Sequence, residues 1–222
     1  VTDHCTFRSE GIWNGDGWDP DSSTNCTLFA SEFCTGGDSV SVKSGKNPEG
    51  NTIGRPSAHI YIFDCRVGFG QGICVGSEMS GGVEDVQVWD CDLENSYSGI
   101  EVKATAKRGG YVRGVTVRDC TAPRVMIHSV PYNDDGEAAG TLPVLEHFTF
   151  AGLTLTGRAL NDKRTWKDVS PVTLAGFEGP DGTLRDVNFD GLTITAKAPR
   201  LPLQYCSEVT LRGMTCLPPQ ED

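Results

Sequence analysis

The stretch Val86-Gln87-Val88-Trp89-Asp90-Cys91 alternates apolar with polar residues and ends on an Asp-Cys step. Tyr61-Ile62-Phe63-Asp64-Cys65 and Val115-Thr116-Val117-Arg118-Asp119-Cys120 repeat this pattern. Residues 148–153, 187–192 and 209–214 repeat it again, with Leu or Met in the place of Cys. Alternation with a period of two residues is typical of a β-strand that buries one face. An internal repeat of such strands fixes the architecture in which every other residue must be placed.

Each repeat also contains a second short strand. These strands are predicted at residues 39–43, 73–76, 100–103, 125–128, 172–174 and 201–203. Their inward apolar residues alternate, as Ile100 and Val102 do, and helical periodicity is absent from the chain. Several strands per repeat and one apolar column indicate an all-β parallel β-helix, in which neighbouring coils bury each other. A β-sandwich is the alternative, but it does not explain why the second strands align.

Length and charge limit the organisation and the partners of the chain. Its 222 residues suffice for one core, so residues 1–222 are predicted to form a single domain that ends in a short tail. The pattern is already under way at Val1, so we expect the chain to be a fragment that lacks its first coils. A formal charge of −11 argues against nucleic acid as a partner. A membrane partner is not expected either, because no apolar run is long enough to cross a bilayer.

The nine cysteines do not require a disulfide framework. Cys65, Cys91 and Cys120 occupy one repeated position, so they are predicted to stack as small buried hydrophobic residues. No Cys-x-x-Cys pair or cluster of histidines accompanies them. We therefore expect no metal site and no cofactor.

Outward-facing residues of the second strands stack into rows at about 4.8 Å, and such rows can form a groove. Alignment places Asp16, Asp38, Gln71 and Ser98 in a first row, Asp19, Ser41, Cys74 and Glu101 in a second, and Asp21, Lys43, Gly76 and Lys103 in a third. Asp16 and Asp38 then have carboxylates about 5 Å apart, which would raise the pKa of one and favour acid/base chemistry. The alternative is that both are ordinary turn residues.

Four motifs in these rows carry a resemblance. They are Asn14-Gly15-Asp16-Gly17, Thr35-Gly36-Gly37-Asp38, Gly76-Ser77-Glu78-Met79-Ser80-Gly81-Gly82 and Gly99-Ile100-Glu101-Val102-Lys103. On these motifs the chain resembles glycoside hydrolase family 28, the polygalacturonase family, in its bacterial type. The resemblance covers about residues 1–135, and residues 136–216 continue the repeat without signature residues.

The resemblance implies a right-handed parallel β-helix that hydrolyses pectic α-galacturonides with inversion, outside the cell, in the periplasm or at the cell surface. By position, it implies that Asp16 helps to activate water and that Asp38 is a partner base. It also implies that Lys103 binds a substrate carboxylate. The expected partner is a pectic polysaccharide.

Three positions depart from the family pattern. The family's general acid is replaced by Gly37 and its substrate-binding arginine by Glu101. Its histidine is replaced by Gln71, or by Gly70 if the bacterial register, which is shifted by one residue, holds. None of His4, His59, His128 and His147 is predicted to substitute. Loss of a general acid costs about 10²–10⁴-fold in rate, so the acid would be Asp38, Asp19 or Glu101, with Glu101 the poorest because it lies two coils away. The chain is therefore predicted to be a hydrolase with altered chemistry or substrate. The alternative is a non-catalytic carbohydrate-binding relative.

Other residues are predicted to flank the groove. Lys43, Lys46, Arg55, Lys107 and Arg108 are candidates for contact with pectin carboxylates, or else are solvated turn residues. Trp13 is a candidate to stack on a sugar ring, whereas Trp18 is assigned to the core. Tyr111 is also predicted to face the groove.

Overall fold

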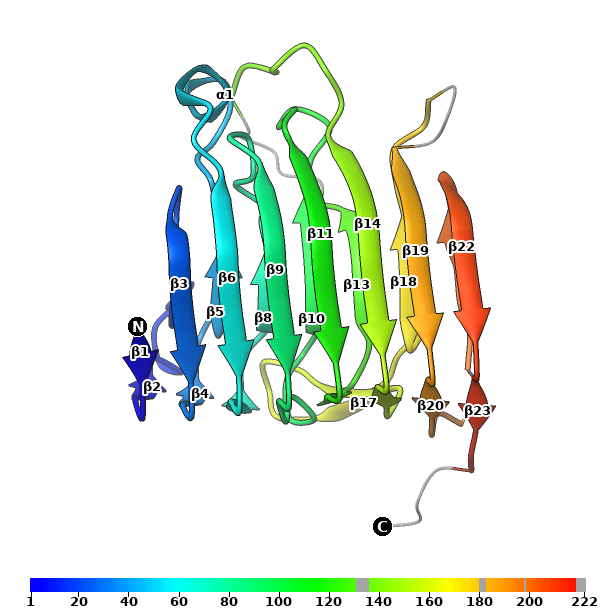
Figure 1. The fold of residues 1–222 in the computed structure, drawn as a ribbon. Coiled ribbons are helices and arrows are strands. Elements are labelled where there is room, and N and C mark those ends of the chain that lie inside the picture. Colours follow the sequence, from blue (N-terminus) through cyan, green and yellow to red (C-terminus); the bar gives the residue numbers. More distant parts are fainter. Residues whose placement is uncertain (131–135, 180–182, 198, 219–222) are drawn as a thin grey trace.

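The long strands lie side by side and all run in the same direction, as Figure 1 shows. The computed structural model describes residues 1–130, 136–179, 183–197 and 199–218. The eight-stranded sheet consists of β1 (Thr2–Asp3), β3 (Thr24–Phe29), β6 (Ser57–Phe63), β9 (Val83–Trp89), β11 (Tyr111–Arg118), β14 (Val144–Ala151), β19 (Leu184–Asp190) and β22 (Cys206–Arg212). Every pair of neighbours in it is parallel, as the repeat predicts.

A second parallel sheet lies behind the first in Figure 1. It consists of β5 (Val40–Val42), β8 (Gly72–Val75), β10 (Gly99–Ala104), β13 (Val125–Ser129), β18 (Val172–Ala175) and β21 (Leu203–Gln204). Five of the six predicted second strands are confirmed within one or two residues. The last, predicted at residues 201–203, instead begins at Leu203.

The sequence did not predict a third row of very short strands. This row consists of β2 (Thr6–Arg8), β4 (Glu32–Cys34), β7 (Arg66–Phe69), β12 (Thr121–Ala122), β15 (Thr154–Leu155), β20 (Thr193–Ile194) and β23 (Thr215–Cys216). Asp92 bridges its two halves by pairing with Arg66 and Thr121. The three rows together make the chain a right-handed parallel β-helix, so the predicted fold is confirmed.

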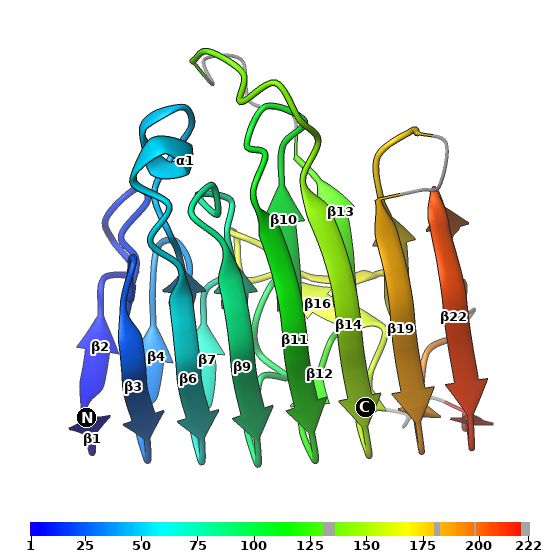
Figure 2. The same cartoon turned by 45° about the horizontal axis from the view of Figure 1, so that its top comes forward.

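Two elements interrupt the regular winding. The five-residue helix α1 (Glu49–Ile53) lies along the edge of the β-helix at which the long strands begin, as Figure 2 shows. β16 (Arg158–Leu160) and β17 (Trp166–Asp168) form an antiparallel hairpin. No helix in the described part of the chain is both long enough and apolar enough to cross a bilayer.

The Asp-Cys step is a corner of the winding, where the chain leaves the eight-stranded sheet. Asp64, Asp90 and Asp119 have φ values of 51°, 53° and 54°, in the left-handed region that a short polar side chain tolerates. The other copies place Gly152, Gly191 and Gly213 at the same corner, with φ values between 60° and 67°. The alternation of Asp and Gly in the repeat therefore has a conformational cause.

The residue after each of these corners, except the last at Gly213, points into the core. These residues are Cys65, Cys91, Cys120, Leu153 and Leu192, and each is at most 4% exposed. Above them, the inward residues of the long strands form a continuous apolar column (Ile60, Val86, Val115, Phe148 and Val187), which is fully or almost fully buried. Burial of each such side chain contributes about 1.5–3 kcal/mol. The burial of Cys65, Cys91 and Cys120 confirms their predicted role as small hydrophobic residues of the core. All nine cysteines are free.

The register of the second sheet fixes the rows on its outer face. Val40 pairs with Ile73 and Ile73 with Ile100, so these apolar residues point inward. The residues between them form the predicted row of Ser41, Cys74 and Glu101.

Candidate functional site

A polar depression of about 280 Å³ lies on the outer side of β5, β8 and β10. It brings together five of the predicted site residues, namely Asp16, Asp38, Lys43, Gln71 and Lys103. Trp13, Asn14, Gly36, Gly37, Ser77 and Glu78 complete its walls. The side chains come from successive coils, so the stacking of the coils assembles the site.

Asp16 is held as an ionised carboxylate. Its Oδ1 accepts a hydrogen bond of 2.9 Å from the backbone N–H of Asp38, and its Oδ2 lies 3.1 Å from Lys43 Nζ. Burial acts to raise the pKa of Asp16, but the Asp38 amide and the Lys43 ammonium outweigh it, so the pKa is lowered. Asp16 and Asp38 are therefore neighbours, as the alignment predicts.

Asp19 shares the ammonium of Lys43 with Asp16. The distance from Lys43 Nζ to Asp19 Oδ2 is 2.7 Å. Burial is the largest effect on Asp19 and raises its pKa to about 6, with the negative charge of Asp16 acting in the same direction. One lysine cannot fully neutralise two carboxylates, and Asp16 has the Asp38 amide as well. Asp16 thus stays ionised, while Asp19 carries a proton in mildly acidic solution.

Asp38 and Lys103 form a second, more deeply buried ion pair. Lys103 Nζ lies 2.9 and 2.8 Å from the two carboxylate oxygens of Asp38. Their side chains are only 12% and 9% exposed, for Lys103 and Asp38 respectively. Burial alone would lower the pKa of Lys103, but the surrounding negative groups raise it. Lys103 is therefore a fixed cation that spans two coils to reach Asp38.

The lack of a side chain at Gly37 leaves space that the carboxylate of Asp16 occupies. A Cβ atom added at Gly37 would lie 2.1 Å from Asp16 Oδ1, which is far inside van der Waals contact. The place where a side chain at position 37 would begin is thus filled by the Asp16 carboxylate. A larger residue at position 37 requires that carboxylate to move.

Glu101 lies one coil beyond Cys74 on the same row and is 7% exposed. Its Oε1 is 2.7 Å from His128 Nε2, and its Oε2 lies 3.7 Å from Cys74 Sγ. Burial acts to raise the pKa of Glu101, but the His128 hydrogen bond and the Lys103 charge prevail and lower it to about 2. Glu101 is consequently ionised and cannot act as the replacement acid.

His128 is a residue that the sequence reasoning missed. Its partner in the register is Lys103, on the neighbouring strand β10. The row that was aligned through Lys43 and Lys103 simply continues to His128, so extension of the alignment by one coil would have found it.

Two predicted groove residues have other roles. Tyr111 belongs to β11 in the eight-stranded sheet, and its hydroxyl donates to Glu84 Oε2 at 3.2 Å, so its prediction as a groove residue is wrong. Arg108 is 1% exposed and donates from Nε to the Ser77 carbonyl at 2.9 Å. It therefore supports the loop after β8 from beneath and does not offer its charge to a ligand.

The aromatic predictions have separate outcomes. Trp18 packs against the hydrophobic core, as predicted. Trp13 is 94% exposed at the wall of the depression.

Lys107 is one of the cations that were predicted to flank the groove. Its ammonium donates a hydrogen bond of 3.0 Å to the Gly136 carbonyl.

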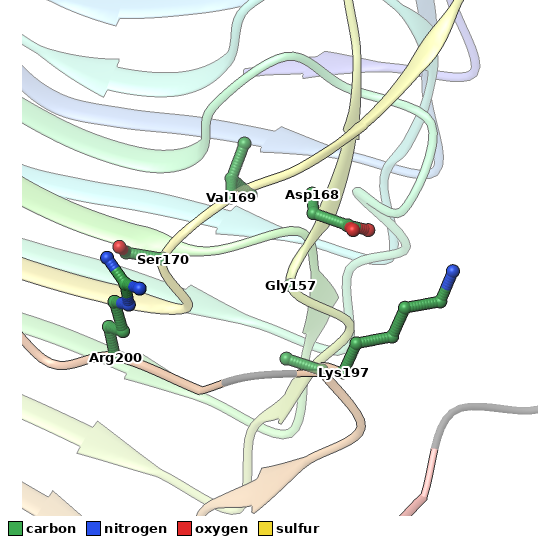
Figure 3. A pocket seen from close by; sticks show the side chains of 7 residues that line it. Gly157, Asp168, Val169, Ser170, Lys197 and Arg200 are labelled. Atoms are coloured by element: carbon green, nitrogen blue, oxygen red, sulfur yellow. The ribbon is translucent and has the colours of Figure 1, made fainter.

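A second depression lies between β17 and the segment that follows β20 (Figure 3). Ser170 and Arg200 lie on one side of it, and Asp168 and Lys197 on the other. All three charged side chains are solvent-exposed, which is the ordinary state of surface charges. Among the described residues, no group of three or more His, Cys, Asp or Glu side chains is arranged to hold a metal ion.

Comparison with known proteins identifies related sequences. The model for glycosyl hydrolases family 28 matches residues 3–131. A probable polygalacturonase of Vitis vinifera is 41% identical over 110 residues, which cover 49% of this chain and 22% of that protein. The polygalacturonase of Ralstonia solanacearum is 34% identical over 134 residues, covering 56% of this chain and 24% of the relative. The chain thus spans about a quarter of the length of these relatives.

Two solved structures share the fold. A hyperthermoactive exopolygalacturonase from Thermotoga maritima superposes with a TM-score of 0.73 at 27% identity, covering 98% of this chain and 46% of its own. A family 28 exopolygalacturonase from Yersinia enterocolitica superposes with a TM-score of 0.76 at 18% identity, covering 94% of this chain and 37% of its own. The latter likeness concerns the fold alone.

Proposed function

Because the chain belongs to glycosyl hydrolase family 28, we propose that it hydrolyses glycosidic bonds of a pectic polysaccharide, with inversion and with altered catalytic groups. The bond is that of an α-galacturonide or a related glycoside. One observation carries the proposal: an ionised Asp16 and a protonatable Asp19 share the ammonium of Lys43, and Asp16 also accepts from the backbone N–H of Asp38, whose carboxylate pairs with Lys103. Inverting hydrolysis needs one carboxylate as base and one carboxylic acid as proton donor. The proposed location of the protein is outside the cell after secretion, in the periplasm or at the cell surface.

Asp19 is the proposed proton donor. Of the three replacement candidates, Glu101 is ionised and Asp38 is bound through both oxygens to Lys103. The raised pKa of Asp19 leaves it protonated in mildly acidic solution. Its proton passes to the leaving oxygen as the bond from that oxygen to the anomeric carbon breaks.

Asp38 is the proposed base, assisted by Asp16. An inverting acid and base stand about 6.5–9.5 Å apart to admit water. Asp16 and Asp19 are too close for this arrangement, because both bind one Lys43 Nζ, at 3.1 and 2.7 Å. Asp38 therefore takes the proton of the water whose oxygen attacks the anomeric carbon, while Asp16 orders the Asp38 backbone.

Trp13 and Lys103 are the proposed substrate-binding residues, together with Gln71 and Lys43. The exposed indole of Trp13 offers a face for a sugar ring at the wall of the depression. Lys103 and Gln71 offer polar groups at its floor.

Release of reducing ends from polygalacturonate and rhamnogalacturonan tests the proposal. We expect Asp19→Asn and Asp38→Asn each to lower the rate by about 10²–10⁴-fold, because each removes one proton-transfer group. Asp119→Asn is the matched control, because it makes the same change at a corner that lies outside the depression. An unchanged rate in Asp19→Asn would exclude that residue as the acid.

A second candidate function is carbohydrate binding without turnover. It is favoured by the observation that Asp16 fills the space beside Gly37 and that each lysine of the depression is paired with a carboxylate. Binding of both polysaccharides with no release of reducing ends would support this candidate. Activity that is lost in Asp38→Asn would contradict it.

A further inference from the structure

Arg124 lies on the outer face of the second sheet, immediately before β13. Val125 is fully buried, so the side chain that precedes it points outward. The Nη2 atom of Arg124 donates a hydrogen bond of 3.2 Å to the backbone carbonyl of Tyr97 in the preceding coil. The N–H of Tyr97 in turn donates to the carbonyl of Gly70, the neighbour of Gln71, which lines the depression. Arg124 therefore stands beside the depression, on the side of the later coils.

The guanidinium of Arg124 has no carboxylate within ion-pair distance in the part of the chain that the structure describes. Its hydrogen bond to Tyr97 uses only one of its N–H groups, and its Nε is buried without a partner among the described residues. Burial lowers the pKa of Arg124, while the negative charge of Glu101 acts in the opposite direction. A partly buried charge without a partner is costly, and a bound anion reduces that cost. Lys43 and Lys103, by contrast, are already bound to carboxylates of the protein.

The hairpin of β16 and β17 brings a second arginine to the same place. In Figure 2 the hairpin, drawn in yellow, extends from its own coil back toward β7. Its tip carries Arg164, whose guanidinium carbon lies 3.9 Å from the centre of the Phe69 ring. Phe69 lies edge-to-face against Tyr97, with 5.1 Å between the ring centroids. The two arginines therefore contact one aromatic pair, Arg164 at the ring of Phe69 and Arg124 at the carbonyl of Tyr97.

The charge around this aromatic pair is mainly positive. Lys163 and Arg164 are both exposed at the hairpin tip, and neither lies within ion-pair distance of a carboxylate in the described ranges. The acidic groups that act on the aromatic pair and on Arg124 are Asp162, at the same tip, and Glu101. The three cations outnumber these two carboxylates. An anionic ligand is therefore favoured here, because complementary charge guides and selects a partner.

We propose that Arg124 and Arg164 bind the carboxylate of a uronate unit of the polysaccharide, next to the unit whose bond is cleaved. The inference rests on the proposed function, since it takes the substrate to be a pectic chain that lies over the depression. A guanidinium binds a carboxylate through charge-assisted hydrogen bonds, which are stronger than those between neutral groups. The ligand is thus a free uronate and not its methyl ester, which carries no charge. Arg124 determines this specificity from the face of the sheet, and Arg164 assists it from the hairpin.

The test compares polygalacturonate with its fully methyl-esterified form, in calorimetric binding and in release of reducing ends. The native protein should bind polygalacturonate about tenfold more tightly at low salt, because a hydrogen bond between charged groups contributes about that factor. This preference should shrink as salt is added, because salt screens charges that are open to solvent.

Four variants connect the preference to the arginines. Arg124→Gln should weaken binding of polygalacturonate and raise its KM about tenfold with little change in kcat, since the contact lies away from the reacting bond. Arg124→Lys keeps the charge and should restore part of that loss. Arg164→Gln should weaken binding about threefold, because an exposed charge contributes less. Arg118→Gln is the matched control, because Arg118 also lies over an aromatic ring, that of Trp89, but on the eight-stranded sheet.

The ratio between the two polymers is the decisive readout, because a purely structural role of Arg124 would change both affinities by one factor. Circular dichroism and urea unfolding confirm that each variant is folded. A preference for polygalacturonate that Arg124→Gln abolishes and Arg118→Gln leaves intact supports the inference.

The other outcomes separate the inference from the proposed function. Cleavage without any preference for polygalacturonate, or with a preference that Arg124→Gln leaves unchanged, overturns the inference alone. An equal change toward both polymers in Arg124→Gln overturns it as well. Binding that depends on Arg124 without cleavage of either polymer supports the inference and overturns the proposed hydrolysis. Absence of both binding and cleavage overturns both.

Discussion

Removal of the Lys103 ammonium should destabilise the protein strongly. Asp38 and Lys103 are 9% and 12% exposed, and their two contacts measure 2.9 and 2.8 Å. Loss of one member of such a buried pair costs about 3–5 kcal/mol, because the other charge is left without compensation. Glu101 keeps His128 as its partner, so only Asp38 loses its ion pair. We therefore expect Lys103→Met to lower the free energy of unfolding by about 3 kcal/mol, at the lower end of this range.

Urea unfolding of single and double variants measures this effect. Addition of Asp38→Asn to Lys103→Met should restore about 2 kcal/mol, because the uncompensated charge is gone. Arg113→Met is the control, since its ion pair with Glu84 is much more exposed to solvent than that of Lys103 and should contribute less than about 1 kcal/mol. A loss below about 1 kcal/mol in Lys103→Met, or a double variant no more stable than the single one, would refute the reasoning.

Three further predictions concern the core, the corners and the dependence of stability on pH in acidic solution. Phe150 is fully buried, and its ring stacks on that of Phe189 with 4.9 Å between the ring centroids. Phe150→Ala should therefore lower the free energy of unfolding, measured in urea, by about 3–5 kcal/mol. At the corner, Asp90→Gly should leave the free energy of unfolding nearly unchanged. Asp90→Val should lower it by about 1–2 kcal/mol, because the backbone is left-handed there. Equal effects of the two variants would contradict the conformational argument. Folding raises the pKa of Asp19 from 3.8 to about 6. The protonated carboxyl therefore contributes fully to the free energy of unfolding below about pH 4, and this contribution is lost as the pH rises through about 6. Asp19→Asn should therefore flatten the fall in unfolding free energy between about pH 4 and pH 6, and an unchanged slope would show that another group is responsible.

The winding could be predicted because two constraints repeat in every coil. Alternation marks each long strand, and the left-handed corner favours few residue types, so Asp or Gly recurs at it in all but the first two coils, which have His4 and Ala30 there. The third row of strands could not be predicted in the same way. Strands such as β12 and β15 contain two residues each, which is too short for a period to be visible.

The candidate site was predictable as a set of rows but not as a set of contacts. The period of two residues passes from strand to strand through the register, so the row of Ser41, Cys74 and Glu101 followed from alignment. The length and direction of a side chain do not follow from it. Lys103 therefore reaches back across two coils to Asp38, and Lys43 is shared by two carboxylates.

Tyr111 shows where proximity in sequence to a motif misleads. It follows the Lys107 to Gly110 segment closely, but the chain has by then entered β11 of the other sheet. Its hydroxyl consequently meets Glu84 on that sheet. A residue near a site in sequence is near it in space only while the chain stays on the same side of the coil.

The corner residues and the register together also determine how such a site can change over evolutionary time. The groups of the depression come from successive coils, and the apolar column of the core packs those coils together. A replacement at one outward-facing position therefore changes the site while the spacing of the coils is kept. The scaffold can therefore accept a new side chain on its outer face without a rearrangement of the coils.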